Sequence, residues 1–251
     1  MRGGGPPRGF TEFIVGNARV VCAEQLADDF RAALRESTLY DYARRYPRAR
    51  VFAGRGASYG IRFPSSAEGI VVRHNRHGGL LASLTGDVFH APTRAPLELE
   101  VSERLRSLQI PTPRLLGFVT YPVMPGFARA DVATGEVENA SDLSASLTSN
   151  ERGLREQALQ AAATLVRQLS DAGARHHDLN IKNVLLRAEG EGIAPTAFVL
   201  DVDRVTFGLD RRAAIEANVA RFVRSAKKWR RLHGASVTDV ELDSFASMAR
   251  G

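Results

Sequence analysis

Two stretches of the sequence place polar side chains directly beside apolar runs. The first, "HHDLNIKNVLL", has Asp178 and Asn183 in the pattern H-x-D-L-x-x-x-N, and the second, "FVLDVD", ends an apolar run at Asp201. A loop carboxylate is able to accept the proton of a hydroxyl group. Carboxylate and amide oxygens are also ligands for magnesium ions that hold phosphates. Asp201 taken alone also suits a turn-capping aspartate. Together, and in this order, the three residues predict phosphoryl transfer.

Two histidines, His176 and His177, precede Asp178. Zinc requires three or four ligands at set spacings, whereas the sequence has one cysteine, Cys22, and no H-x-x-x-H pair. This disfavours a metal site at the histidines. We expect His176 to support the loop by packing under it and hydrogen-bonding its backbone.

A glycine-rich run, "GRGASYG", lies between two β-rich segments. Its glycines, Gly54, Gly56 and Gly60, allow backbone N–H groups to approach phosphate oxygens closely, although glycines in a hairpin also mark simple turns or bulges. No Gly-Lys-Ser/Thr follows, so the run is not a P-loop.

A kinase-type site also requires a cation on the strand after the glycine-rich run, paired with a glutamate on a helix. The candidates are Arg73 in "GIVVRH" and Glu98 in "LELEVSERL", with Glu100 less favoured. Arginine here departs from the lysine of protein kinases, and the alternative is a surface arginine with a solvated helix glutamate.

The order of elements is β-rich and then helix-rich, and together with the kinase-type motifs above it predicts an α+β, two-lobed protein-kinase-like fold. Residues 1–10 are rich in Gly, Pro and Arg and are predicted to be disordered. Residues 11–137 form a predicted N-lobe with an antiparallel sheet, one continuous helix ending before Pro47, and the helix of Glu98. Residues 138–251 form a short helical C-lobe with a small hairpin that carries the acidic residues.

The net charge of +6 favours anionic partners. The predicted last helix, 211–232, has an apolar side, and its opposite side carries Arg221, Arg224, Lys228 and Arg231. This basic side is either a solvated face or a contact with an anionic membrane surface or phosphorylated glycolipid. Nucleic acid is not expected, because these cations are not interleaved with aromatic side chains.

The N-terminal segment "MRGGGPPRGF" lacks the apolar region of a signal peptide, and no apolar run is long enough to span a bilayer. The single cysteine suits a reducing compartment. We therefore expect a cytoplasmic protein, for which a peripheral membrane role remains open.

The stretches "GRGAS", "VVRHNRHGGLL", "TRAPLELEVSERLRSLQIPTPRLLG", "ARADVATGEV", "HHDLNIKNVLL" and "LDVDR" resemble the lipopolysaccharide kinase family. The resemblance covers about residues 50 to 230 and is strongest to the 3-deoxy-D-manno-octulosonic acid (Kdo) kinases. It implies ATP-dependent phosphorylation of the Kdo sugar of Kdo-lipid A at the cytoplasmic face of the inner membrane.

The resemblance also implies roles for individual residues. Asp178 would be the catalytic base, and Asn183 and Asp201 would be ligands of Mg²⁺. Arg73 and Glu98 would orient the ATP phosphates. The remaining nucleotide contacts would be Gly54, Gly56, Ser58 and Gly60 over the phosphates and Glu136 and Val137 beside the adenine.

Two alternatives remain open from the sequence. One is a related kinase-like phosphotransferase for another small molecule or for protein, although no A-P-E sequence follows Asp203 as it would in a protein kinase. The other is a pseudokinase or basic scaffold that binds membrane or nucleic acid without catalysis.

Overall fold

The computed structural model describes residues 5–52, 56–75 and 88–251. The chain forms two compact units: Met1–Glu100 with Arg114–Glu136, and Val101–Pro113 with Val137–Gly251. The sequence analysis assigned residues 101–113 to the first lobe. They belong to the second unit because Val101, Leu105 and Ile110 lie in its hydrophobic core.

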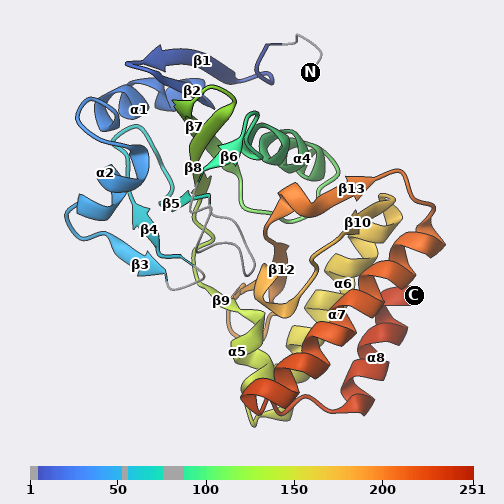
Figure 1. The fold of residues 1–251 in the computed structure, drawn as a ribbon. Coiled ribbons are helices and arrows are strands. Elements are labelled where there is room, and N and C mark those ends of the chain that lie inside the picture. Colours follow the sequence, from blue (N-terminus) through green and yellow to red (C-terminus); the bar gives the residue numbers. More distant parts are fainter. Residues whose placement is uncertain (1–4, 53–55, 76–87) are drawn as a thin grey trace. The chain divides into compact units, whose positions relative to one another are not determined.

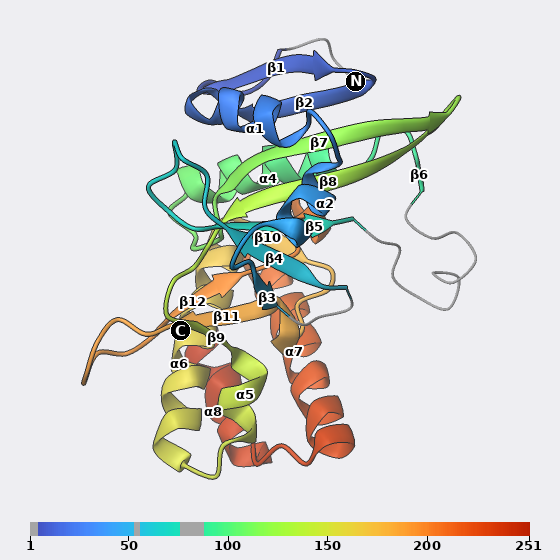
Figure 2. The same cartoon turned by 90° about the vertical axis from the view of Figure 1, so that its left-hand side faces the viewer.

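The first unit is built on an antiparallel sheet with the strand order β1-β2-β7-β8-β5-β4-β3, in which β6 pairs with β8 (Figures 1 and 2). β1 starts at Phe10, within the segment predicted to be disordered, and a turn at Gly16 and Asn17 leads into β2. The strands are β1 (Phe10–Val15), β2 (Ala18–Ala23), β3 (Arg50–Phe52), β4 (Ser58–Ile61), β5 (Ile70–His74), β6 (Phe89–His90), β7 (Leu115–Met124) and β8 (Phe127–Gly135).

The single helix predicted before Pro47 is wrong, because the chain breaks into separate helices there. A 3₁₀ turn, η1 (Glu24–Leu26), leads into α1 (Ala27–Ala33), and α2 (Leu39–Arg45) follows after a break. The Thr38 side chain caps α2 by accepting a hydrogen bond from the Asp41 N–H at 3.1 Å. A side chain that bonds to a nearby backbone N–H offers the chain an alternative to continuing a helix. Here the Thr38 side chain marks the start of a new helix.

A buried carboxylate joins α2 to the sheet beside Arg73. Asp131 of β8 is fully buried and accepts hydrogen bonds from the Tyr121 hydroxyl and the Tyr40 N–H, both at 2.9 Å. The His74 ring nitrogen Nδ1 lies 2.5 Å from the same carboxylate. Since a buried charge is stable only with such partners, this network holds the end of β5 in place.

α4 (Ala95–Ser107) contributes residues to both units. Its first half places Ala95 and Leu99 in the core of the first unit, and Val101 and Leu105 belong to the core of the second. Glu98 is therefore carried by the half that packs with the sheet.

The second unit contains α5 (Leu143–Thr148), α6 (Arg152–Asp171), α7 (Arg211–His233) and α8 (Asp239–Arg250), and α6 packs against α7 and α8 (Figure 1). Its short strands form a three-stranded sheet in the order β12-β11-β9 and a pair, β10 with β13. These strands are β9 (Ala140–Asp142), β10 (Ala174–His176), β11 (Val184–Arg187), β12 (Thr196–Val199) and β13 (Val205–Phe207).

Glycine is required where α6 ends. Gly173 has φ +62°, and a Cβ there would lie 2.5 Å from the Leu209 carbonyl oxygen. Its own carbonyl oxygen accepts hydrogen bonds from the N–H groups of Gly208 and Leu209, at 3.1 and 3.2 Å. This close approach connects the start of β10, which leads into the "HHDLN" segment, to the start of α7.

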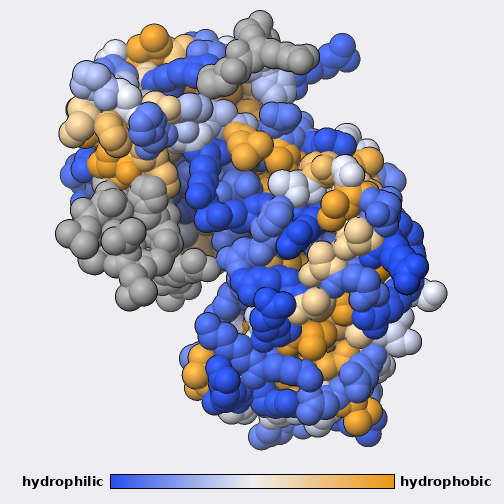
Figure 3. All heavy atoms as spheres, turned by 45° about the vertical axis from the view of Figure 1, so that its right-hand side comes forward, coloured by the Kyte–Doolittle hydropathy of each residue, from blue (hydrophilic) through white to orange (hydrophobic). Residues whose placement is uncertain are grey.

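The molecular face shown in Figure 3 is mostly hydrophilic, with apolar side chains scattered among the polar ones. Within the described ranges, no helix combines the length and apolar content that a membrane span requires.

Candidate active site

Residues 177–183, which connect β10 to β11, form the candidate catalytic loop and hold Asp178 and Asn183 together. The Asn183 side-chain nitrogen Nδ2 donates to the Asp178 carbonyl oxygen at 2.9 Å, and the Asn180 N–H donates to the same oxygen at 2.8 Å. The loop ends in a 3₁₀ turn, η2 (Ile181–Asn183). The Asn183 side-chain nitrogen is used in this bond, so its side-chain oxygen is the atom available to bind a cation.

His176 lies under this loop and is 1% exposed. Its Nδ1 accepts a hydrogen bond from the Asp178 N–H at 3.1 Å, and its Nε2 lies 2.9 Å from the Leu200 carbonyl oxygen. A carbonyl oxygen only accepts, so the neutral ring carries its proton on Nε2. His176 thus connects the catalytic loop to the residue before Asp201.

Burial lowers the pKa of His176 below its ordinary value, and this effect outweighs the Leu200 carbonyl and the carboxylates of Asp201, Asp178 and Asp203, which favour the charged ring. The unfolded chain therefore takes up this proton at higher pH than the folded chain. As pH falls below about 6.5, the free energy of unfolding should decrease by up to about 1.4 kcal/mol per pH unit, until the folded ring also titrates. Denaturant titrations between pH 5 and 7.5 measure this slope.

The matched variants are His176→Asn and His177→Asn. His177 is exposed and bonds through Nε2 to the Thr206 hydroxyl at 2.9 Å. His176→Asn should flatten the pH dependence of unfolding, and His177→Asn controls for the loss of a neighbouring histidine. Equal slopes in the wild type and His176→Asn would contradict the assignment of the proton uptake to this ring.

Asp201 follows β12 and carries an exposed carboxylate in a left-handed backbone conformation, with φ +52°. The preceding residue, Leu200, donates its N–H to the Asn183 carbonyl oxygen at 2.9 Å and accepts from His176. These bonds bring the backbone before Asp201 to the end of the catalytic loop.

The Asn183 amide oxygen and the Asp201 carboxylate are the two side-chain oxygens here that could hold a cation. Among the residues that the structure describes, no group of three or more His, Cys, Asp or Glu side chains is arranged to hold a metal ion. Two protein ligands fit a magnesium ion, which keeps several waters and takes further oxygens from phosphates. The pair does not resemble a closed structural metal site.

One side of α7 lies along the catalytic loop. The Arg221 guanidinium forms an ion pair with the Asp178 carboxylate, and the Ser225 hydroxyl accepts from the Ile181 N–H at 3.2 Å. One turn further, the Lys182 ammonium lies 5.0 Å from the centroid of the Trp229 ring. Residues four apart on a helix share a face, so this face contacts successive residues of the loop.

Asn218 extends this contact line towards the start of α7. It is fully buried, and its side-chain oxygen accepts from the His176 N–H at 3.0 Å. Its side-chain nitrogen donates to the Ala174 carbonyl oxygen at 2.9 Å and to the Ser170 hydroxyl at 3.2 Å. Because all of these bonds are made inside the core, the Asn218 amide holds β10, and therefore the start of the catalytic loop, in place.

In the first unit, Arg73 and Glu98 form an ion pair. Arg73 lies on β5 and also donates to the Asn75 side-chain oxygen at 2.8 Å. Glu98 is 5% exposed, so its carboxylate is shielded from water and not a solvated surface group. The structure thus brings together the two residues that the sequence analysis paired.

The glycine-rich run is described in part, and Gly54 lies outside the described residues. Gly56 lies in a bend two residues before β4, and Ser58 is the first residue of that strand. Gly60 lies within β4, where a Cβ would come within 2.9 Å of the Phe52 ring. A side chain at this position would displace the Phe52 ring of β3.

Glu136 and Val137 lie where the first unit's chain passes to the second. The Glu136 N–H donates to the Gly69 carbonyl oxygen at 2.8 Å, and its carboxylate pairs with Arg50. Because the Glu136 N–H is already bonded, an adenine base beside this segment would have to form its hydrogen bonds with other backbone groups.

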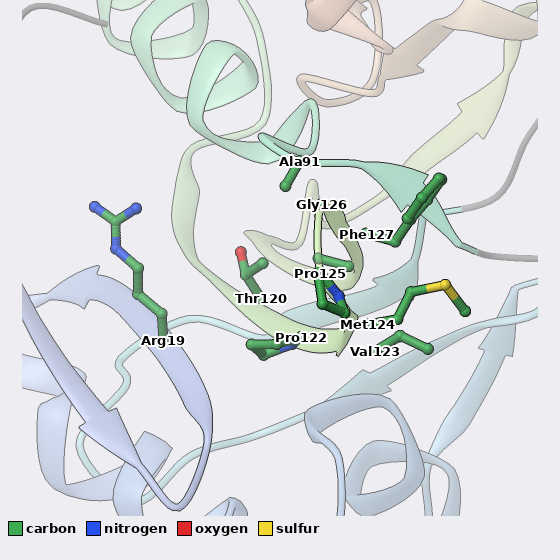
Figure 4. Close-up of a pocket in the computed structure, with 10 residues that line it drawn as sticks. Arg19, Ala91, Thr120, Pro122, Val123, Met124, Pro125, Gly126 and Phe127 are labelled. Carbon is green, nitrogen blue, oxygen red and sulfur yellow. The ribbon is translucent and has the colours of Figure 1, made fainter.

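A surface pocket of about 420 Å³ lies elsewhere in the first unit, around the turn of the β7–β8 hairpin (Figure 4). Its lining is mostly apolar and includes Pro122, Val123 and Met124. The one charged residue in the lining, Arg19, pairs with Glu12. Among the described residues, the lining thus offers one cation, which is already paired, and no carboxylate to hold a metal ion.

The sequence profile of the lipopolysaccharide kinase (Kdo/WaaP) family matches residues 48–245, most of the chain. The chain belongs to this family. The matched segment includes the candidate catalytic loop, Asp201, and the Arg73–Glu98 pair.

Curated relatives in the family are 3-deoxy-D-manno-octulosonic acid kinases. The chain is 29% identical to that of Pasteurella multocida, over 62% of this chain and 65% of the relative. It is 31% identical to that of Actinobacillus succinogenes, over 53% and 55%, and 29% identical to that of Stenotrophomonas maltophilia strain K279a, over 78% and 75%. The match thus spans less than two thirds of the length of the first two relatives.

Among solved structures, WaaP in complex with acyl carrier protein is similar in fold, with a TM-score of 0.56 at 17% sequence identity. The similarity covers 92% of this chain and 88% of the WaaP chain. The α+β, kinase-like fold predicted from the sequence is confirmed.

The sequence analysis missed the role of Arg221 and Ser225 as neighbours of the catalytic loop. It placed Arg221 with the solvent-facing cations of the last helix, whereas this side chain contacts Asp178. The helical spacing of residues 221, 225 and 229 was visible, but nothing in the sequence paired it with a loop about forty residues earlier.

Proposed function

We propose that this protein transfers the γ-phosphoryl group of ATP to a sugar hydroxyl, most specifically to the Kdo residue of Kdo-lipid A. The observation that carries the proposal is the joined arrangement of Asp178, Asn183 and the backbone before Asp201 in one unit. The Kdo kinase names of the curated relatives support the acceptor.

In the proposed reaction, Asp178 accepts the proton of the acceptor hydroxyl as its oxygen bonds to the γ-phosphorus and the bond to the ADP oxygen breaks. Arg221 holds the Asp178 carboxylate in position. Asn183 and Asp201 would hold Mg²⁺, which would neutralise charge on the phosphate oxygens. The chain contributes mainly positioning and electrostatic stabilisation, as is general for phosphoryl transfer.

The proposed nucleotide contacts come from the first unit. Gly54, Gly56 and Ser58 would cover the phosphates, with Gly60 supporting the loop through its place in β4. Arg73, held by Glu98, would contact phosphate oxygens, since a guanidinium binds them bidentately. Glu136 and Val137 would border the adenine.

We also propose peripheral contact with the anionic, cytoplasmic surface of the inner membrane, where a lipid-linked acceptor would be reached. The net charge of +6 supports this contact.

The deciding experiment is ATP turnover with and without Mg²⁺, and with and without Kdo-lipid A in nonionic detergent. Stimulation by the acceptor, with phosphate found on the Kdo sugar, is the expected result. Metal-dependent turnover without stimulation would select another acceptor. Absence of turnover under all conditions would select the non-enzymatic alternative.

Replacing Arg221 with glutamine should reduce kcat about 10- to 100-fold, the loss expected for one charge-assisted hydrogen bond that positions a reacting group. The KM for ATP should stay within about 2-fold, because the residue acts on Asp178. Arg221→Lys should recover part of kcat, since it restores charge without the planar fork.

The control is Arg212→Gln, which removes an exposed cation from the same helix. Steady-state kinetics of the three variants provide the comparison. A kcat for Arg221→Gln equal to that of the control would remove Arg221 from the proposed mechanism.

A further inference from the structure

The cations of α7 separate into two groups by their acidic partners. Most have one: Arg211 pairs with Asp171, Arg221 with Asp178, Lys227 and Arg230 with Asp239, and Arg212 interacts with Glu216. Arg224, Lys228 and Arg231 form ion pairs with none of the described residues, and all three are exposed. We call these three residues the cationic strip.

The strip is continuous on the helix surface. At 100° per residue, Arg224, Lys228 and Arg231 fall within one narrow sector of the helix. Like charges three and four residues apart repel each other by several tenths of a kcal/mol, so the strip is unfavourable without an anionic partner. Its arrangement indicates a ligand that supplies negative charge.

The strip borders the candidate catalytic loop. Going around α7, the buried side chains of Phe222 and Ala226 come first, then Ser225 and Arg221, which contact the loop. The strip follows directly on the far side of that contact line. Arg224 is one turn from Arg221, and Lys228 is about 10 Å further along the axis than Arg221.

We propose that Arg224 and Lys228 bind an oxyanion of the acceptor, either a carboxylate or a phosphate, and so present its hydroxyl to Asp178. This inference rests on the proposed function and deepens it. Arg221 contacts Asp178 and so marks the position of the reacting hydroxyl. Arg224 and Lys228 lie roughly 6 to 10 Å from Arg221 along the helix, so the oxyanion would lie at about that distance from the hydroxyl. An acidic sugar on a phosphorylated lipid carries such groups, whereas a neutral sugar does not.

The test is the double variant Arg224→Gln/Lys228→Gln, assayed with Kdo-lipid A in nonionic detergent so that no anionic membrane surface is present. The KM for the acceptor should rise about 5- to 30-fold, as expected for the loss of two exposed charge contacts. The values of kcat and of the KM for ATP should stay within about 2-fold, because neither residue contacts the reacting atoms.

The matched control is Arg212→Gln/Lys227→Gln, which removes the same charge from other sides of the same helix and should leave the KM for the acceptor unchanged. Raising the salt concentration should increase the KM of the wild type and control more than that of the strip variant. Two modified acceptors identify the bound group: one has its sugar carboxylate esterified, and the other lacks the lipid phosphates. The wild type should show a higher KM for whichever acceptor has lost the bound group. The KM of the strip variant should be the same for the modified and unmodified acceptors.

An unchanged KM for the acceptor in the strip variant would overturn the inference, while the proposed function would stand on the activity of the wild type. A rise that appears only when the acceptor is embedded in anionic vesicles would also overturn it, in favour of membrane contact. Failure of the wild type to phosphorylate Kdo-lipid A would instead overturn the proposed function itself.

Discussion

Replacing Asp178 with asparagine is expected to lower kcat by about 100-fold or more, the usual contribution of a general base. Asparagine has nearly the same shape and still accepts a hydrogen bond from Arg221, but its amide does not take up the acceptor proton. The Asp178 backbone, which anchors the loop through His176 and Asn183, is unchanged by the substitution. The variant should therefore fold and bind ATP like the wild type.

Steady-state turnover, nucleotide titration and thermal unfolding test these three expectations separately. Asp142→Asn is the matched control, since Asp142 is an aspartate of the same unit whose carboxylate pairs with Lys182. This control should retain nearly full kcat. Wild-type turnover by Asp178→Asn would rule out Asp178 as the base.

Replacing Asp201 with asparagine is expected to raise the magnesium concentration needed for half-maximal activity by at least about 10-fold, and to lower kcat at saturating ATP. Magnesium prefers charged carboxylate oxygen, and the amide removes one negative charge from the proposed site. Asparagine also tolerates the φ of +52° at this position, so the effect should not arise from backbone strain.

Activity titrated against magnesium at fixed ATP measures this change. Asp203→Asn serves as the comparison, because Asp203 lies in the 3₁₀ turn η3 (Val202–Arg204) that directly follows Asp201, and its carboxylate is 3.6 Å from the Arg204 guanidinium. Its magnesium requirement should change less than that of Asp201→Asn. If Asp201→Asn needs no more magnesium than the wild type, Asp201 is not a metal ligand.

Some elements were predictable because their determinants are close together in the sequence. The "HHDLNIKN" motif places Asp178 and Asn183 on one short loop, and the hydrogen bond between them spans five residues. The Gly16–Asn17 turn identified the first hairpin in the same way. Helix α8 was not predicted, although Thr238 and Glu241 form a capping box whose spacing is visible in the sequence.

Other elements depend on partners far away in the chain. The helix predicted before Pro47 is interrupted where Leu39 and Tyr40 donate their N–H groups to Tyr121 and Asp131, more than eighty residues later. Residues 101–113 were predicted as part of the first lobe, whereas they cluster with the second unit, because apolar spacing shows that Val101 and Leu105 are buried without showing against which core.

By itself, the sequence determined the α+β kinase-like fold, the family, and the positions of the local motifs, since short-range spacing controls turns, strands and loop anchors. Only the tertiary structure decided which side chains surround Asp178. Arg221 and Arg224 are one helical turn apart and chemically identical, yet one pairs with Asp178 and the other remains exposed. That difference arises from the packing of α7 along the loop, a contact between segments about forty residues apart.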